Sequence, residues 1–229
     1  YTYESTCLGG TKCVDNPGFK SKDFGLKTDM FYQDWMEEDV GYRLLTLRNP
    51  MKYAHRTVNL VRSKPHPFTL VTDDYKKDDE DSHKWTWYVN LPNGRFQTYL
   101  DVTMEAESSK THEVILRRAG SAGEGKGKPR LLVRMLDWEG SVESALAVVS
   151  KNVKEMRGGS SMPLTRLMVT TEGKSARFKF FFYAFRQGDA LPSTDYNRAS
   201  GMLTVGLGDE TRKIKYSMDA SGRTIVTEA

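Results

Sequence analysis

The clearest alternation of apolar and polar positions lies between residues 130 and 227. Residues 130–136 form a short apolar run that is typical of a buried strand. After it, apolar residues recur at offsets of 3, 4, 7, 11 and 14 from Val142, which fits one face of an α-helix. The pattern therefore predicts a strand followed by one principal amphipathic helix, about 141–157.

Signals at both ends support this helix. Ser141 can serve as its N-cap, because the hydroxyl accepts a free backbone N–H of the first turn. Glu143 places a negative charge near the positive end of the helix dipole, and the last turns carry three cations. Residues 158–159 are both glycine, which commonly ends a helix in the left-handed conformation.

Strand signals follow this helix. Residues 164–171 form one predicted strand, and residues 176–186 form a second that is rich in aromatic side chains. Two further runs, 201–207 and 212–218, flank a Gly-Asp-Glu turn and predict a β-hairpin. A last short strand is expected at 223–227.

The first half of the chain shows shorter strands around an acidic segment. Residues 57–62 and 68–72 are predicted strands, and residues 73–81 hold six carboxylates in nine positions. Carboxylate oxygens suit a hard cation, but the spacing and the glycine of an EF-hand are absent. We therefore expect a solvated loop at 73–81, with a cation site as the alternative.

Apolar residues alternate along the segment 85–91, at Trp85, Trp87, Val89 and Leu91. The alternation favours half of a sheet core, and the alternative is an aromatic platform for a sugar or a base. A Pro-Asn-Gly turn follows, so 96–104 is predicted to pair with 85–91 as a hairpin. Residues 112–118 are expected to add a third strand.

Together these elements predict an α+β fold, in which a mainly antiparallel sheet carries the helix at about 141–157. Residues 1–48 are expected to form an irregular N-terminal arm with short elements. Residues 49–229 are expected to form the α+β domain, with a flexible Gly-rich connector at 119–130.

The net charge of the chain and its distribution only weakly restrict the kind of partner. The net charge is +4, and residues 121–229 hold 17 Lys and Arg against 12 Asp and Glu. A nucleic-acid-binding module usually shows a denser basic stripe, and a basic face that meets an acidic partner protein fits at least as well. A glycan- or nucleic-acid-binding module stays open as the alternative. Its candidate contacts are Trp85, Trp87, Lys52, Arg56, Arg62 and Lys64.

The two cysteines, Cys7 and Cys13, flank a Gly-Gly pair that lets the chain turn back on itself. A disulfide and two free thiols are equally expected, and a disulfide would favour an oxidising compartment. The four histidines are scattered along the chain, so no metal site is expected.

The sequence holds no complete catalytic motif. Gly120, Gly125 and Lys126 have the spacing of a phosphate-binding loop, but Gly127 replaces the Ser or Thr that holds the metal. A strand also follows where that loop requires a helix. We expect no enzymatic activity and no cofactor. A hydrolase with a dispersed site, using residues such as Asp78 and Asp81, is the third hypothesis.

From about residue 93 the order of elements resembles the PsbP-like family in outline. The matching segments are 131–136, 141–157, 173–183 and 201–218. The resemblance implies an α/β/α sandwich and a role as an extrinsic subunit or assembly factor of photosystems in the thylakoid lumen. The resemblance assigns no functional residue of the family to a position of this chain.

These observations predict a non-catalytic accessory or structural subunit of a larger assembly, with protein subunits as its partners. No apolar run approaches the ~20 residues that span a bilayer, so no transmembrane segment is expected. The sequence begins at Tyr1 rather than at Met, which fits a removed leader or a trimmed sequence. The expected compartment is an organellar lumen, the thylakoid lumen by the resemblance, and a secreted protein is the alternative.

Overall fold

The computed structural model describes residues 51–62, 66–77, 79–92, 103–154 and 161–229. Over these ranges the chain forms fourteen strands and one short 3-10 turn, η5 (Ser121–Gly123). The strands are β1 (Met51–Val61), β2 (Phe68–Lys77), β3 (His83–Leu91), β4 (Met104–Lys110), β5 (Glu113–Arg118), β6 (Pro129–Trp138), β7 (Ser141–Val142), β8 (Ala147–Lys154), β9 (Ser161–Gly173), β10 (Ser175–Arg186), β11 (Ser193–Asn197), β12 (Met202–Leu207), β13 (Glu210–Met218) and β14 (Thr224–Glu228). The predicted arm, 1–48, lies outside the described residues.

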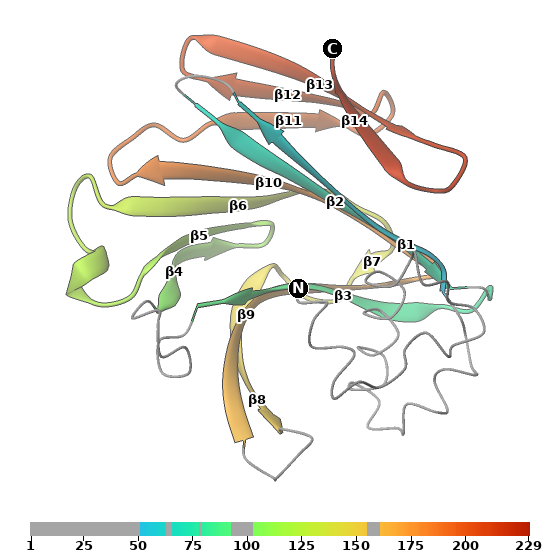
Figure 1. The fold of residues 1–229 in the computed structure, drawn as a ribbon, viewed down its shortest axis with the longest axis horizontal. Helices are drawn as coiled ribbons and strands as arrows, with labels where there is room; N and C mark the ends of the chain where they lie inside the picture. The colour runs from blue at the N-terminus through green and yellow to red at the C-terminus, as the bar shows by residue number, and fades with distance from the viewer. Residues whose placement is uncertain (1–50, 63–65, 78, 93–102, 155–160) are drawn as a thin grey trace.

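The strands form three antiparallel sheets that are stacked in layers (Figure 1). The central sheet has six strands in the order β1-β2-β10-β6-β5-β4. The C-terminal sheet, with the order β11-β12-β13-β14, covers one face of it. The β9 sheet, with the order β3-β9-β7 and with β8 also paired to β9, covers the other face.

The sequence of β10 explains why the central sheet needs a layer on both sides. Successive side chains of a strand point to opposite faces, and here both faces are aromatic. Phe178, Phe180 and Phe182 face the β9 sheet, whereas Phe181, Tyr183 and Phe185 face the C-terminal sheet. Burial of one such ring stabilises the fold by about 1.5–3 kcal/mol, so neither face can remain open to water without loss of stability.

Two separate cores result from this layering. Between the central and β9 sheets, the Trp87 ring stacks on Phe180 with 3.8 Å between ring centroids. Between the central and C-terminal sheets, Phe68 and Phe181 pack at 5.2 Å beside buried leucine and valine residues of β12. The first core unites residues of β2, β3, β5, β6, β9 and β10, and the second unites residues of β2, β6, β10, β12 and β13.

The predicted helix at 141–157 is wrong, and with it the α+β fold class. Residues 141–142 form β7, and residues 147–154 form β8, which pairs antiparallel with β9 from Ala147↔Met168 to Lys154↔Ser161. β8 contains three valines in eight residues, and β-branched side chains favour strands over helices. Pairing with β9 satisfies the backbone of this segment, so tertiary contacts override the helical spacing. The described part of the chain is therefore an antiparallel β protein without an α-helix.

The acidic segment 73–81 differs from its predicted form as well. Its first half belongs to β2, and Asp73 and Asp74 are both fully buried. Residues 85–91 lie in β3, which pairs along one edge with β9, for example Trp87↔Val169, and the hairpin expected with 96–104 stays a prediction. Residues 93–102, which hold most of the predicted partner strand, lie outside the described residues.

The later strands agree well with the sequence pattern. The predicted strands at 130–136, 164–171 and 176–186 lie within β6, β9 and β10. The hairpin predicted from 201–207 and 212–218 corresponds to β12 and β13, and β14 follows it. Among the described residues, no helix is long and apolar enough to cross a membrane.

Candidate functional site

β1 is the terminal strand of the central sheet, and among the described strands it pairs only with β2 (Figure 1). Its other edge therefore presents backbone N–H and C=O groups that no described strand takes up. An edge of this kind is a ready template for a strand of another chain. We call this feature the β1 edge.

The two faces of β1 lie in different environments. On one face, Thr57 Oγ1 donates to the Thr224 carbonyl at 3.0 Å, and the Ser221 carbonyl lies 3.3 Å from His55 Nε2. β14 and the turn before it thus cover this face. On the other face Val58 is 59% exposed and Leu60 is 57% exposed, the highest fractions among the large apolar side chains described. The β1 edge therefore carries an apolar pair that lies open to solvent.

A glycine permits the close approach of the C-terminal sheet to β1. Gly222, in the turn between β13 and β14, has φ +84°, and a side chain there would meet the Tyr53 ring at 2.7 Å. A β-carbon at this position is thus both conformationally strained and sterically excluded. The turn can lie against β1 because residue 222 has no side chain.

A buried carboxylate ties β1 to its neighbours on the side of the β9 sheet. Asp73 accepts two hydrogen bonds from Arg56, at 2.7 and 2.9 Å, and a third from Trp87 Nε1 at 2.7 Å. Asp73 is fully buried, so the paired guanidinium and the indole N–H compensate the cost of its desolvation. This group joins β1, β2 and β3.

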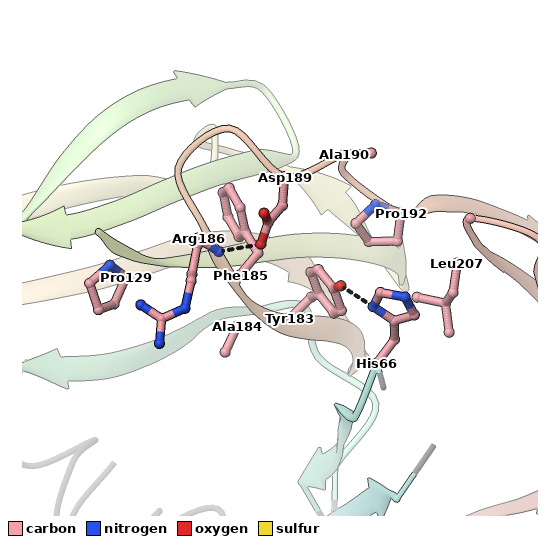
Figure 2. A pocket seen from close by; sticks show the side chains of 11 residues that line it. His66, Pro129, Tyr183, Ala184, Phe185, Arg186, Asp189, Ala190, Pro192 and Leu207 are labelled. Carbon is pink, nitrogen blue, oxygen red and sulfur yellow. Dashed lines mark hydrogen bonds between the residues drawn. The ribbon is translucent and has the colours of Figure 1, made fainter. Parts of the chain in front are cut away.

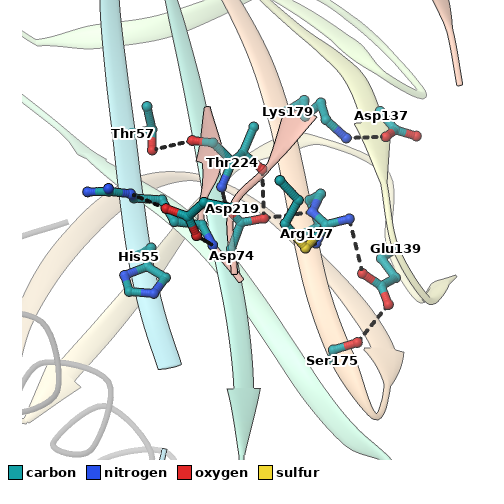
Figure 3. A network of polar contacts seen from close by, with 12 residues as sticks. His55, Thr57, Asp74, Asp137, Glu139, Ser175, Arg177, Lys179, Asp219 and Thr224 are labelled. Carbon is teal, nitrogen blue, oxygen red and sulfur yellow. Dashed lines mark hydrogen bonds and ion pairs between the residues drawn. The ribbon is translucent and has the colours of Figure 1, made fainter. Parts of the chain in front are cut away.

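A second buried carboxylate, Asp74, ties β2 to its neighbours on the opposite face (Figure 3). Asp74 accepts from Arg177 Nε at 2.6 Å, from the Thr224 backbone N–H at 2.7 Å and from Thr224 Oγ1 at 3.0 Å. These bonds join β2 to β10 and to β14. Because β1 and β2 are fixed on both faces, the β1 edge is formed in advance and does not have to order when a partner binds.

The opposite edge of the central sheet is protected. β4 has the sequence Met-Glu-Ala-Glu-Ser-Ser-Lys, and its register shifts between Ala106 and Ser108. Glu105 accepts from Arg117 of β5, and Glu107 accepts from Arg130 of β6. Charged side chains and bulges are common devices against edge-to-edge pairing. The stretch Thr57–Val61 of β1 contains no charged residue.

A cavity of about 610 Å³ lies where β10, the loop before β2 and the turn between β12 and β13 meet (Figure 2). Phe185, Pro192 and Leu207 supply much of its apolar lining. His66 Nδ1 and Tyr183 Oη form a hydrogen bond of 2.9 Å at its wall. Burial raises the pKa of Tyr183, and the charge of Asp189 adds to that rise. The cavity can hold a small ligand with an apolar body, and the His66–Tyr183 pair can form a hydrogen bond with one polar group of that ligand.

A third polar group lies between the central and C-terminal sheets, with Lys179 and Asp137 buried and Arg198 exposed. Lys179 Nζ donates to Asp137 Oδ2 at 2.5 Å, and Arg198 Nε donates to Asp137 Oδ1 at 2.7 Å. Burial lowers the pKa of Lys179, and the hydrogen bond to Asp137 opposes that shift. The Tyr196 ring lies 5.0 Å from the ammonium group. Lys179 is buried, so its position suits a structural ion pair better than contact with a substrate.

The residues proposed from the sequence do not gather into one site. Trp85 and Trp87 lie in the core between the central and β9 sheets, where their N–H groups donate to the Gly173 carbonyl and to Asp73. Neither indole therefore offers an exposed face to a sugar or a base. Tyr88, which neighbours them, is covered by the Arg166 guanidinium at 4.2 Å from its ring.

The cationic candidates fall into three groups. Lys52 and Arg62 are exposed at the two ends of β1, and Arg56 is paired with Asp73. Lys64 lies outside the described residues, as do the cysteines Cys7 and Cys13 and the acidic candidate Asp78. Asp81 is exposed and its backbone N–H donates to Asp79. Within the described ranges, no three His, Cys, Asp or Glu side chains come together as metal ligands.

The exposed pair Val58 and Leu60 was missed as a site by sequence reasoning. A strand was predicted at 57–62, and alternate apolar residues in a strand are ordinarily assigned to a core. Only the position of β1 at the end of the sheet shows that they are exposed. The His66–Tyr183 pair spans 117 positions in the chain, so no local pattern marks it either.

Comparison with known families finds no family model that matches this chain, and comparison with curated proteins finds no relative. The resemblance to the PsbP-like family therefore stays a prediction. Of the segment 141–157, which that resemblance takes as a helix, the described residues 141–154 contain β7 and β8.

Proposed function

We propose that this protein is a non-catalytic accessory subunit that joins a larger protein assembly through the β1 edge. The carrying observation is the exposed pair Val58 and Leu60 on a terminal strand that pairs with β2 alone among the described strands. A photosystem in the thylakoid lumen is the specific assembly that the PsbP-like resemblance suggests. Copurification with a photosystem would therefore support this specific form of the proposal.

Strand addition explains how such an edge would bind. A partner strand takes up the N–H and C=O groups that no described strand pairs with, and its side chains meet the alternate side chains of β1. Full burial of one valine or leucine side chain contributes about 1.5–3 kcal/mol, so Val58 and Leu60 together can supply a useful part of the affinity. The main-chain bonds set the register, and the apolar pair favours a partner with apolar residues at matching positions.

The test is copurification of the full chain from its source, with wild type and a Val58→Gln/Leu60→Gln variant in parallel. Both side chains are exposed, so the variant should fold with little change in stability. We expect the wild type to copurify with a stoichiometric complex. The variant should bind the partner at least about tenfold more weakly, which corresponds to ~1.4 kcal/mol of binding free energy.

Leu191→Gln is the matched control for this experiment. Leu191 is also an exposed leucine, but it lies in the loop between β10 and β11 rather than on β1. This variant should retain the partner. A wild-type chain that elutes alone, or a double variant that binds as well as the control, would contradict the proposed function.

A further inference from the structure

We infer that the partner segment bound at the β1 edge is acidic: it carries carboxylates near both of its ends and apolar side chains between them. The inference rests on the proposed function and adds the chemistry of the partner. It follows from the charges along β1 and from the way in which the neighbouring carboxylates are used.

The β1 edge carries an exposed cation near each end, Lys52 and Arg62. Residues 51–62 include Lys52, His55, Arg56 and Arg62, and they include no Asp or Glu. Lys52 and Arg62 are exposed, and no ion pair with a described residue neutralises either of them. A strand rises about 3.3 Å per residue, so these two charges lie roughly 33 Å apart. A bound strand of about eleven residues can meet both.

The carboxylates of the adjacent strand do not offset these cations. Asp73 and Asp74 are fully buried, and they are paired with Arg56 and Arg177. Asp74 also accepts from Thr224, on the face that the C-terminal sheet covers. The charge that remains at the surface of the edge is therefore that of Lys52 and Arg62. Opposite charges placed across an interface speed association and fix its register.

Charge disfavours two antiparallel registers in which a second copy of the chain could pair with this edge. An antiparallel pair of β1 strands centred on Thr57 places Lys52 opposite Arg62. A pair centred on Asn59 places Arg56 opposite Arg62. Both registers bring cations together across the new pair, and like charges directly opposite one another destabilise a sheet. A different chain with carboxylates avoids this repulsion and offers Lys52 and Arg62 opposite charges.

The apolar pair sets the middle of the partner segment. Val58 and Leu60 lie on the same face of β1, since side chains two positions apart in a strand share a face. They lie across from Val71 and Thr69 of β2. A partner strand with apolar residues at two alternate central positions would bury them, and its terminal carboxylates would then lie near Lys52 and Arg62.

Synthetic peptides of about eleven residues test the inference on the full chain. Three peptides share one apolar centre and differ only at two positions near each end, which hold Glu, Gln or Lys. Titration by fluorescence anisotropy should show the Glu peptide binding roughly tenfold more tightly than the Gln peptide, with no detectable binding of the Lys peptide. Raising the salt from about 0.05 to about 0.5 M should remove most of that difference.

Charge reversal provides the matched variants. Lys52→Glu/Arg62→Glu should invert the preference, so that the Lys peptide binds better than the Glu peptide. Lys126→Glu/Lys128→Glu changes two exposed cations of the turn before β6 and should leave the preference intact. Equal binding of the Glu and Gln peptides would overturn the acidic partner while leaving strand addition standing, provided that Val58→Gln/Leu60→Gln weakens both.

Other occupants give other results, and each would overturn the inference. Failure of all three peptides to bind at about 1 mM would contradict the inference and the proposed function together. Heparin that binds through Lys52 and Arg62 more tightly than the Glu peptide would assign the edge to polyanions. A concentration-dependent dimer that Val58→Gln/Leu60→Gln abolishes would assign it to a second copy. A photo-crosslink from position 58 to residues 1–50 would assign it to the chain itself.

Discussion

The buried carboxylates of β2 join residues that lie far apart in the sequence. Asp73 binds Arg56, 17 positions away, while Asp74 binds Arg177 and Thr224, 103 and 150 positions away. Each carboxylate is fully buried and accepts three hydrogen bonds. A buried, fully paired charge is strongly destabilising when one partner is removed, because the other is left unpaired. These two residues therefore hold the β1 edge in place.

Asp74→Asn tests this role at the scale of a residue. The substitution keeps the size of the side chain but removes the charge that pairs with Arg177. We expect it to lower the free energy of unfolding by roughly 2–4 kcal/mol. Denaturant unfolding measures this loss.

Asp209→Asn is the comparison for that measurement. Asp209 is exposed in the turn between β12 and β13, where either side chain is tolerated. It should change the free energy of unfolding by less than about 0.5 kcal/mol. Equal changes in the free energy of unfolding for the two substitutions would show that the hydrogen bonds of Asp74 do not stabilise the fold.

The same residues show where sequence reasoning stops at this scale. Six carboxylates in nine residues predict a solvated loop, because isolated charges are rarely buried. The cations that permit the burial of Asp73 and Asp74 come from other strands, and the sequence around residue 73 does not predict these pairings. The exposure of Val58 and Leu60 was hidden for the same reason, since it depends on which strand ends the sheet.

At the scale of elements, β8 shows how a local pattern can be correct in spacing and wrong in structure. Apolar residues from 142 to 156 fit the helical period, and the charges fit the helix dipole. Yet β8 pairs with β9 over its full length. Valine is common in both strands and buried helix faces, so hydrophobic periodicity alone does not decide. By contrast β10, whose aromatic residues serve both faces, was predicted correctly as a strand.

NMR on the labelled chain tests the identity of this element. We expect strand-like Cα chemical shifts over 147–154 and cross-strand contacts between Val148 and Leu167, because these residues are paired. A helix would instead show contacts between residues three positions apart. The pair Leu203 and Ile214, from the hairpin of β12 and β13, is the internal reference for a strand contact. Helical shifts over 147–154 would contradict the fold described.

At the scale of the whole molecule, the two aromatic faces of β10 require three layers, and three layers determine which edges remain open. The C-terminal and β9 sheets pack on the two faces of the central sheet, so another strand can add to that sheet at its ends. β4 ends it with charged residues and a bulge in mid-strand, whereas β1 has its register shift at the start, between Met51 and Tyr53, and exposes an apolar pair in the uncharged stretch 57–61. The alternating patterns predicted most strands, but the layering came from pairings between distant segments.

Amide hydrogen exchange of the full chain, alone and in its purified complex, tests the docking edge most directly. In the free chain, the amides of β1 that face β2 should exchange slowly, and the alternate amides on the open edge should exchange fast. In the complex we predict that the fast amides of β1 become protected while those of β4 keep their rates. Unchanged exchange along β1, with protection appearing on another surface, would contradict the account.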